Sequence, residues 1–293
     1  MLFRSVSQSR YAIVGPTVKG PVNIPTIVTS YSEYLNKFGG VFESGSNTHE
    51  YLTSISAYNY FQQGGDSLLV TRVVSGSFTP ATSTNILNSL PTASASFVLE
   101  TLSYGSIMNS SGSEGTNGAL ISGSADNLRW EITTPNTSSG TFTLLIRRGN
   151  DLQNSKAILE SWPNLSLDPM SPNYIESVIG NQSYSITDNY LQVDGDWKNR
   201  SKYVRVKQVN TPTLNYFDNN GIAKPEYTSS IPVAASGTFG GATGTLSGVY
   251  GTPDSAYTSS LGLLSNKDEF QFDILTVPGK TQQSNSSVVH LLS

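Results

Sequence analysis

The residues whose types and spacing could support chemistry are few in this chain. Asp194 and Asp196 flank a glycine in the sequence DGDW, and carboxylates are common ligands of Ca²⁺. A calcium loop of the EF-hand type also needs further oxygen ligands at fixed spacing and a distal glutamate, which this sequence lacks. The pattern therefore favours a turn between two strands.

The histidines indicate no better site. The chain contains His49, His290 and no cysteine, so a zinc site would need both histidines together with carboxylates. His49 is expected at the start of a helix, as a solvated or capping residue. A nucleophilic serine needs a neighbouring base, and no G-x-S-x-G motif is present.

Two patterns could bind an anion. The sequence GTFGGATG at residues 237–244 is glycine-rich, but a phosphate loop needs Lys and Ser or Thr after its last glycine, and Thr245 and Leu246 follow here. Arg147 and Arg148 come at the end of a predicted strand, where pairing with local carboxylates is the commoner role. We therefore predict no catalytic, cofactor-binding or metal-binding residue, and a chain that is not an enzyme.

The composition points to a β-rich protein with many neutral contacts. Charged residues make up 13% of the chain, about half the usual share, and the net charge is −4 without any run of Lys or Arg. This argues against a direct nucleic-acid partner. No apolar run approaches the length that a membrane-spanning helix needs, so we expect no membrane insertion. The absence of a signal-peptide pattern at the start favours a cytoplasmic product.

Residues 1–75 are predicted to form alternating strands and helices. Short strands are predicted at residues 12–14 and 27–28, and a helix capped by Ser30 follows, with Glu33 completing a capping box. A second helix is predicted after a cap at Thr48. Its apolar stripe comprises Tyr51, Leu52, Ile55, Tyr58 and Phe61. Residues 68–74 form an apolar run typical of a strand covered on both faces.

At Ser75 the composition changes to Ser, Thr, Gly and Asn with short β-prone pieces. Strands are predicted at residues 97–102, 119–122, 128–133, 141–147, 183–186 and 203–209. One helix is predicted with Ser171 as its cap, Pro172 at its first position and its end at Ile179. A short helix near residues 257–264, a buried strand at 272–277 and a helix start at 284–293 complete the chain.

These elements predict an α+β or α/β core domain that carries an inserted β-rich domain. The predicted division assigns residues 1–75 to the first part of the core, 76–254 to the insertion and 255–293 to a return into the core.

Five stretches, in order, carry a resemblance to a known family. They are AIVGPTVKGP at 12–21, TSYSEYLNKFG at 29–39, YNYFQQGGDSLLVTRVV at 58–74, LSLDP with NYIESVI at 165–179, and FGGATG with FDILTVPG at 239–244 and 272–279. Together they resemble the tail sheath proteins of contractile bacteriophages. Family members usually have an arm before the first stretch and continue well past the last one, so the chain resembles an N-terminal and central fragment of a sheath protein, truncated in its returning core.

The resemblance implies a structural subunit of the virion. Such subunits form stacked hexameric rings and a helical polymer around the tail tube, contact baseplate and tail terminator proteins, and are assembled in the cytoplasm of the host bacterium. Contraction of the polymer drives the tube through the host envelope. The resemblance also implies arms that add strands to the sheets of neighbouring subunits.

An alternative remains open at this stage. The polar, tyrosine-containing middle region would also suit another virion or surface protein, such as a β-rich adhesin or other binding protein. The absence of a signal-peptide pattern and the α/β opening are the features that count against that alternative.

Overall fold

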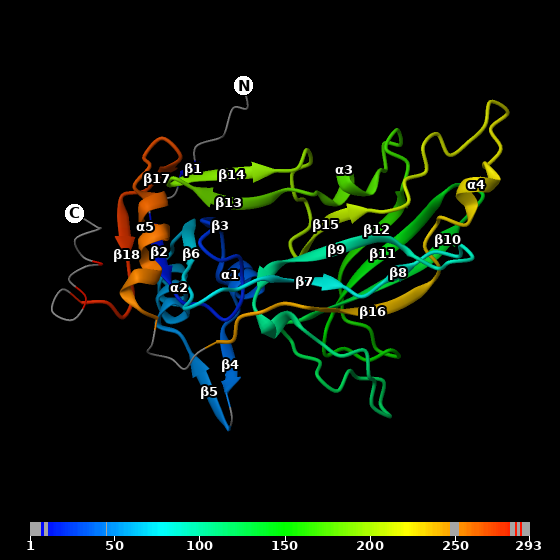
Figure 1. The fold of residues 1–293 in the computed structure, drawn as a ribbon. Helices are drawn as coiled ribbons and strands as arrows, with labels where there is room; N and C mark the ends of the chain where they lie inside the picture. The colour runs from blue at the N-terminus through cyan, green and yellow to red at the C-terminus, as the bar shows by residue number, and fades with distance from the viewer. Residues whose placement is uncertain are drawn as a thin grey trace. The chain divides into compact units, whose positions relative to one another are not determined.

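The computed structural model describes residues 7–8, 11–44, 46–246, 252–281, 285 and 288 of the 293-residue chain. It is a mixed α/β structure in which strands predominate, arranged in several sheets (Figure 1). The chain divides into two compact units. Unit 1 comprises residues 1–78, 184–193 and 244–293, and unit 2 comprises residues 79–183 and 194–243.

Unit 1 is organised around a four-stranded sheet with the order β18-β2-β6-β3. Its strands are β2 (Tyr11–Gly15), β3 (Thr26–Val28), β6 (Leu68–Arg72) and β18 (Ile274–Thr276). β18, β2 and β6 run parallel, whereas β3 is antiparallel to β6. Two small sheets accompany it: β1 (Ser7–Gln8) with β17 (Phe270–Gln271), and β4 (Val41–Ser44) with β5 (Asn47–Glu50).

Helices cover both faces of this sheet. On one face, Leu68 and Val70 of β6 pack with α1 (Tyr31–Phe38) and α2 (Leu52–Gln62). On the other face, Leu69 packs with α5 (Thr258–Leu264). Helix α5 follows the 3₁₀ turn η2 (Asp254–Tyr257). Side chains alternate across a strand, so an apolar run in β6 is what a strand covered on both faces requires. The prediction for residues 68–74 is confirmed.

Helix α1 begins and ends as predicted, with one difference in its cap. Ser30 accepts a hydrogen bond from the Glu33 amide at 3.1 Å. The Glu33 carboxylate, however, accepts from the backbone and hydroxyl of Thr29, at 2.8 and 2.9 Å, and not from the Ser30 amide. The helix ends at Gly39, whose φ of 73° favours glycine.

Three predictions for unit 1 are wrong. Thr48 and His49 lie in β5, so Thr48 does not cap α2, whose N-cap is Tyr51. The predicted apolar stripe of α2 lies largely outward, because Thr53, Ser54 and Ala57 are the buried residues. The strand predicted at 272–277 is shorter and is an edge strand with Ile274 exposed, so it is not buried on both faces. The helix start predicted at 284–293 lies outside the described residues, apart from positions 285 and 288.

Unit 2 contains an eight-stranded antiparallel sheet. Its main order is β12-β11-β10-β16-β7-β9-β15, and β8 also pairs with β9. The strands are β7 (Pro80–Ser83), β8 (Ile86–Leu87), β9 (Ala95–Tyr104), β10 (Leu128–Asn136), β11 (Thr141–Arg148), β12 (Ile158–Ser166), β15 (Val204–Val209) and β16 (Ala235–Gly240). A single apolar core with Trp130, Phe97 and Phe142 at its centre holds the sheet together.

Short helices and a hairpin complete the chain between these strands. They are η1 (Ser106–Met108), α3 (Ile175–Ile179), α4 (Pro225–Thr228) and the hairpin β13 (Ser183–Thr187) with β14 (Tyr190–Asp194). Helix α3 contacts both edge strands of the sheet, β12 and β15, which shows that the sheet is curved. Residues 184–193, which are nearly the whole hairpin, fall in unit 1, where Ile186 and Leu191 pack against the core beside α5.

Most predicted strands of unit 2 are present, with two corrections. Residues 119–122 form turns and isolated bridges and no strand. Helix α3 begins at Ile175 with Tyr174 as its N-cap, so Ser171 and Pro172 precede it in a turn. Strands β7, β8, β12, β14 and β16 were not predicted. A proline at residue 163 interrupts β12, and β16 contains two glycines.

Candidate functional site

The residues considered for chemistry are scattered. Asp194 ends β14, and both it and Asp196 are exposed on a turn in which Asn181 accepts a hydrogen bond from the Trp197 amide at 2.8 Å. His49 lies in β5 with its ring 5.4 Å from that of Phe42. His290 lies outside the described residues. Over the described ranges, no three His, Asp or Glu side chains are close enough to share a metal ion.

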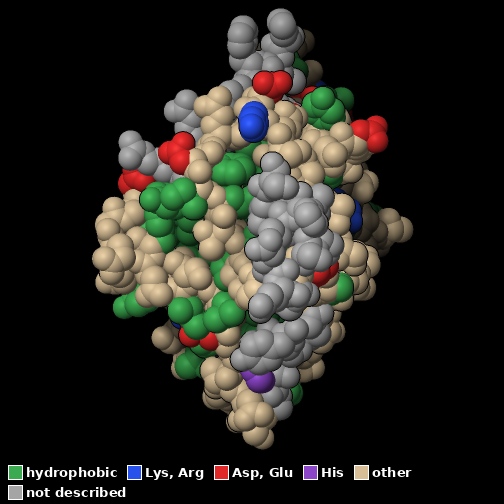
Figure 2. Space-filling view, turned by 90° about the vertical axis from the view of Figure 1, so that its left-hand side faces the viewer, with side chains coloured by type: hydrophobic (Ala, Val, Ile, Leu, Met, Phe, Trp, Pro, Cys, Tyr) green, Lys and Arg blue, Asp and Glu red, His purple; other side chains and the backbone are tan. Residues whose placement is uncertain are grey.

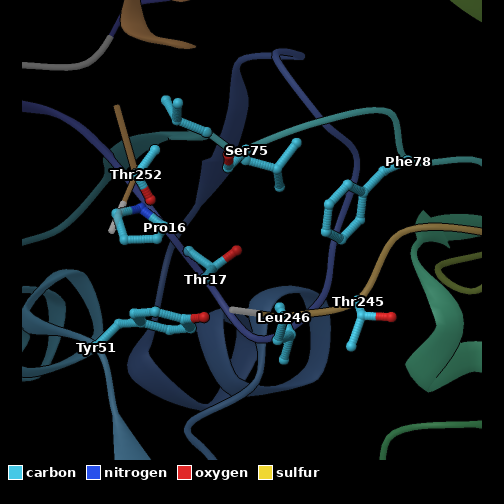
Figure 3. A pocket seen from close by; sticks show the side chains of 10 residues that line it. Pro16, Thr17, Tyr51, Ser75, Phe78, Thr245, Leu246 and Thr252 are labelled. Carbon is cyan, nitrogen blue, oxygen red and sulfur yellow. The ribbon is translucent and has the colours of Figure 1, made fainter. Parts of the chain in front are cut away.

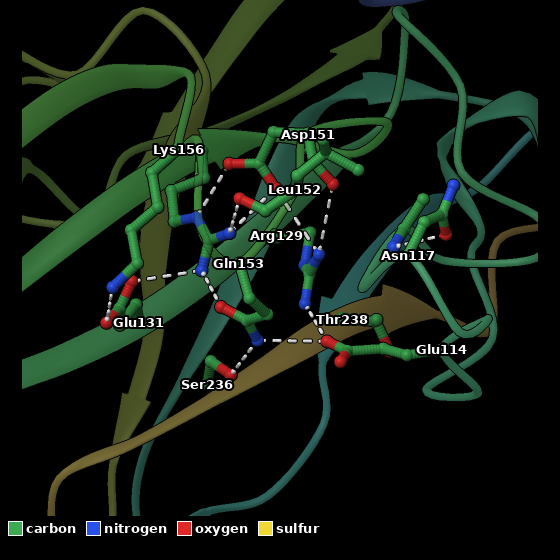
Figure 4. Close-up of polar contacts among 12 residues, drawn as sticks. Glu114, Asn117, Arg129, Glu131, Asp151, Leu152, Gln153, Lys156, Ser236 and Thr238 are labelled. Atoms are coloured by element: carbon green, nitrogen blue, oxygen red, sulfur yellow. Dashed lines mark hydrogen bonds and ion pairs between the residues drawn. The ribbon is translucent and has the colours of Figure 1, made fainter.

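The glycine-rich stretch and the arginine pair have structural surroundings. Residues 237–240 belong to β16, where a Cβ on Gly237 would lie 2.5 Å from the Trp130 ring, so the glycine lets the two strands approach. Arg148 is exposed. Arg147, in contrast, is fully buried and belongs to a charge cluster in unit 2 with Glu131 and Asp151. Figure 4 shows this cluster.

The charge cluster contains two buried arginines that share one buried carboxylate. Arg147 donates to Asp151 through Nε and Nη2 at 2.7 and 2.8 Å, and Arg129 donates to the same carboxylate at 3.3 Å. The backbone amide of Ala157 adds a fourth bond to Asp151 at 3.0 Å. Since every oxygen of this carboxylate is engaged and its side chain is inaccessible, the cluster can hold strands together but offers no group to a substrate.

Glutamates at the rim complete the cluster. Glu131 pairs with Arg147 and Lys156, at 3.0 and 2.6 Å, and Glu114 pairs with Arg129. Gln153 bridges the two halves, donating to Glu114 at 2.9 Å and accepting from Arg147 at 3.0 Å. Hydrogen bonding from Gln153, together with Arg129, holds the pKa of Glu114 below its usual value. This carboxylate thereby fastens residues 109–127 to β10.

Unit 1 contains two shallow hollows at the carboxyl ends of its parallel strands. The first, of about 240 Å³ including open solvent, is shown in Figure 3. Its lining residues are Pro16, Thr17, Tyr51, Val73, Val74, Ser75, Phe78, Thr245, Leu246 and Thr252. The second, of about 440 Å³ including open solvent, shares Pro16, Tyr51 and Thr252 with the first and adds Tyr257 and Lys280. Ligands of open α/β sheets often bind at this edge.

The lining of these hollows supplies little for catalysis. Among the residues that line either hollow, Lys280 is the one with a charge, and it is neutralised by Asp254 at 2.8 Å. Burial raises the pKa of the Tyr51 hydroxyl, which makes it a weaker acid. The geometry supports packing between chain segments better than general acid–base chemistry.

Arg72, at the end of β6, is a structural residue that the sequence analysis missed. It is fully buried and donates to the backbone oxygens of Gly20 and Val18, at 2.7 and 3.5 Å. Its guanidinium also lies 5.1 Å from the centre of the Phe78 ring. Burial lowers the pKa of Arg72 to about 9, which still leaves it charged at neutral pH. The sequence signal that could have identified this residue is the presence of an arginine within the otherwise apolar run at residues 68–74.

Two surfaces of unit 1 remain open for contacts among the described residues. Strand β18 pairs with β2 along one side only, and Ile274 on it is 47% exposed. The outer face of α2 presents Leu52, Ile55 and Tyr58 to solvent. On the face of the molecule drawn in Figure 2, hydrophobic and neutral polar side chains predominate and charged ones are few.

Comparisons with known proteins were made at three levels. No protein-family model and no curated protein matches the chain. Among solved structures, the chain is similar to a sheath tail protein from Listeria innocua, at 11% sequence identity and a TM-score of 0.47. The match covers 98% of this chain and 45% of the Listeria protein. A sheath tail protein from Desulfitobacterium hafniense matches 99% of this chain and 48% of its own, at 11% identity and a TM-score of 0.40. The chain thus spans about half the length of each.

In the described residues, no helix has the length and apolar character that crossing a membrane requires.

Proposed function

We propose that this chain is a structural subunit of a contractile phage tail sheath. One observation carries the proposal: three resembling stretches near the start of the chain and one near its end meet in a single sheet and its helices. Residues 12–21 supply β2, residues 29–39 supply α1, residues 58–74 supply β6, and residues 272–279 supply β18. Four of the resembling segments therefore build one core, whereas the segments at 165–179 and 239–243 lie in unit 2.

Among the residues that the structure describes, β18 pairs along one side only, and its open side supports self-polymerisation. An unpaired strand edge presents backbone N–H and C=O groups that a strand of another subunit can bind. Main-chain hydrogen bonds of this kind tolerate large rearrangements of the side chains around them. The low proportion of charged residues also favours rearrangement of the contacts between subunits. Few ion pairs would have to break when neighbouring subunits slide past one another during contraction.

The proposal includes partners and a place of action. The subunits assemble in the host cytoplasm as stacked six-membered rings around a tail tube, between a baseplate and a terminator. Contraction is a change between two arrangements of the same interfaces and needs no chemical step. The resulting polymer is helical, because each contact joins different surfaces of two copies.

Domain insertion is part of the same proposal, with residues 76–254 inserted into a core made of 1–75 and 255–293. Limited proteolysis followed by mass spectrometry tests it. We expect the first cleavages near the two junctions and a protected middle fragment. The division would be contradicted if the first cleavages fell within residues 1–70 and released the middle region as an intact fragment without any attached part of the core.

Negative-stain electron microscopy tests the function. The complete reading frame that contains these residues is expressed alone, purified and imaged across a range of protein concentrations. Tubes of helical polymer are the expected result. Monodisperse globular particles at every concentration would contradict a sheath role and favour the alternative of a β-rich binding protein, for which a glycan array is the direct assay.

A further inference from the structure

The hairpin β13–β14 is a self-contained element. Its turn is formed by Asp188 and Asn189, whose φ angles of 52° and 62° give the two-residue turn that suits the twist of paired strands. Within the part of the chain that the structure describes, its two strands pair with each other and with no other strand. An isolated two-stranded hairpin is only marginally stable in water, so this one depends on the surface against which it packs.

Helix α5 has a glycine at the point where the hairpin turn approaches it. A Cβ on Gly262 would lie 2.6 Å from the Asn189 side-chain oxygen and 3.1 Å from its Cγ. A glycine inside a helix makes that helix less stable than an alanine would. The close approach of the hairpin turn is therefore the structural reason for a glycine at this position of α5, and the sequence of the helix is adapted to hold the hairpin.

The surface that holds the hairpin is nevertheless small. Ile186 and Leu191 pack against the unit 1 core beside α5, but both are only partly buried. Seven of the ten residues at 184–193 are exposed and none is fully buried, so release of the hairpin uncovers little apolar surface. Segments with few buried apolar contacts open locally while the rest of a protein stays folded.

We propose that the hairpin β13–β14 is a releasable clasp, which leaves α5 and returns to it while both units stay folded. The chain passes between the units at four places, and two of these lie at the ends of residues 184–193. When the hairpin is released, the passages at 78–79 and 243–244 remain as the links. Release gives the two units freedom to move relative to each other. The inference goes beyond the proposed function and does not depend on polymerisation.

Hydrogen exchange of the full chain tests whether the hairpin opens by itself. Exchange is followed peptide by peptide in residues 184–193 and in β6, a buried inner strand of the unit 1 sheet. We expect the protection of the hairpin amides to be at least roughly ten-fold lower than that of the β6 amides. Equal protection would show that the hairpin opens only when unit 1 unfolds, and would overturn the proposal.

A disulfide between the turn and α5 distinguishes release of the hairpin from fraying of its strands. The sequence contains no cysteine, so Asn189→Cys with Gly262→Cys introduces one pair of thiols. The 3.1 Å between the Gly262 Cβ position and Asn189 Cγ places the two Cβ atoms close to the roughly 3.5 to 4.5 Å that disulfides span. The matched control is the same protein with its thiols reduced.

Oxidation is expected to hold the clasp closed. Exchange at residues 184–193 should become roughly ten-fold slower than in the reduced protein, whereas exchange in β6 should change much less. An unchanged rate at the hairpin would overturn the proposal, since the hairpin would then not leave α5. Failure of the disulfide to form would overturn it as well, because the turn and the helix would not be adjacent.

A second variant acts in the opposite direction. Gly262→Leu fills the space that the Asn189 side chain occupies, although leucine favours helix more than glycine does. We expect roughly ten-fold faster exchange at residues 184–193 and a much smaller change in β6. Ser259→Leu, at an exposed position of the same helix, is the matched control and should leave the hairpin unchanged. The proposal is overturned if both substitutions have the same effect, or if Gly262→Leu accelerates β6 as much as the hairpin.

Discussion

Buried charge at single residues determines several contacts in both units. Arg72 holds the turn after β2 by its bonds to Gly20 and Val18, and Asp151 joins two arginines in unit 2. Removing one partner of a buried ionic contact usually costs more than the intact contact contributes, because the remaining group is left without a partner in a medium of low polarity.

Replacement of Arg72 tests this in unit 1. For Arg72→Met we expect a loss of about 2 to 4 kcal/mol in the free energy of unfolding, since two buried carbonyl oxygens lose their donor. Denaturant unfolding followed by fluorescence measures it. The control is Arg148→Met, at an exposed position, for which a change within about 0.5 kcal/mol is expected. Equal effects of the two substitutions would contradict the role given to Arg72.

Replacement of Asp151 tests the cluster in unit 2. Asp151→Asn keeps the shape but leaves Arg147 and Arg129 without their shared counter-charge, so we expect a loss of about 3 to 5 kcal/mol. The control, Asp194→Asn, changes an exposed carboxylate and is expected to be neutral. Thermal unfolding by calorimetry distinguishes them, and a transition unaltered by Asp151→Asn would contradict the prediction.

Acid should loosen the same cluster through Glu114. The pKa of this carboxylate is lower in the folded chain than its usual value of 4.5, so its stabilising effect is complete above that value and is lost as the pH falls through the folded pKa. We expect the protection of amides in residues 109–127 against hydrogen exchange, relative to their intrinsic exchange rates at each pH, to fall below about pH 4.5. In Glu114→Gln this protection should change less with pH. An identical pH profile in both proteins would contradict the assignment.

At the scale of elements, both kinds of local signal were right in some places and wrong in others. The start of α1 at Ser30 and its end at Gly39 were predicted from capping chemistry, and the buried strand β6 from its apolar run, whereas Thr48 and Ser171 do not cap α2 and α3. Apolar spacing misled for α2, because a helix that approaches a strand closely needs small residues inward and leaves large ones outside. Strand β16 could not be predicted, since the pairing that forms it comes from distant residues in β10. Strand β12 pairs with the preceding strand β11, and the proline at residue 163 interrupts its strand signal.

Candidate sites were predictable only in part. Local motifs were enough to question the calcium and phosphate interpretations, because each motif has a fixed spacing that can be checked along the chain. The charge cluster could not be foreseen, since Arg129, Arg147 and Glu114 come from separate strands and a loop that only the fold brings together. As expected for an arginine at a strand end, Arg147 pairs with a local carboxylate, that of Asp151 four residues later.

The cap of α1 provides a test at the element scale. Ser30→Ala removes the side-chain acceptor for the Glu33 amide, so we expect about 1 kcal/mol of destabilisation. Ser32→Ala, at an exposed position inside the same helix, is the control and is expected to be neutral or slightly stabilising, because alanine favours helix. Urea unfolding measures both, and a neutral Ser30→Ala would show that the cap does not support the helix.

At the scale of the whole molecule, the hairpin β13–β14 is assigned to a different unit from the chain that precedes and follows it. Residues 184–193 belong to unit 1 although the chain on both sides belongs to unit 2. Leu191→Asp should therefore destabilise unit 1 and leave unit 2 largely intact, because Leu191 packs against the core beside α5. Hydrogen exchange measured peptide by peptide gives the protection of each unit separately. Tyr190→Asp, at a residue that is 56% exposed, is the control. Loss of protection confined to unit 2 would contradict this.

The pairing of β2 with β18 also has a consequence during protein synthesis. Tyr11 aligns with Ile274, so the ribosome must add nearly all of the sequence between them before β2 meets this neighbour. At about 5 to 20 residues per second, the wait is on the order of 10 to 50 s. The strands and apolar core of unit 2 have all emerged by then. All residues of unit 2 are thus available for folding before β18 can join the sheet of unit 1.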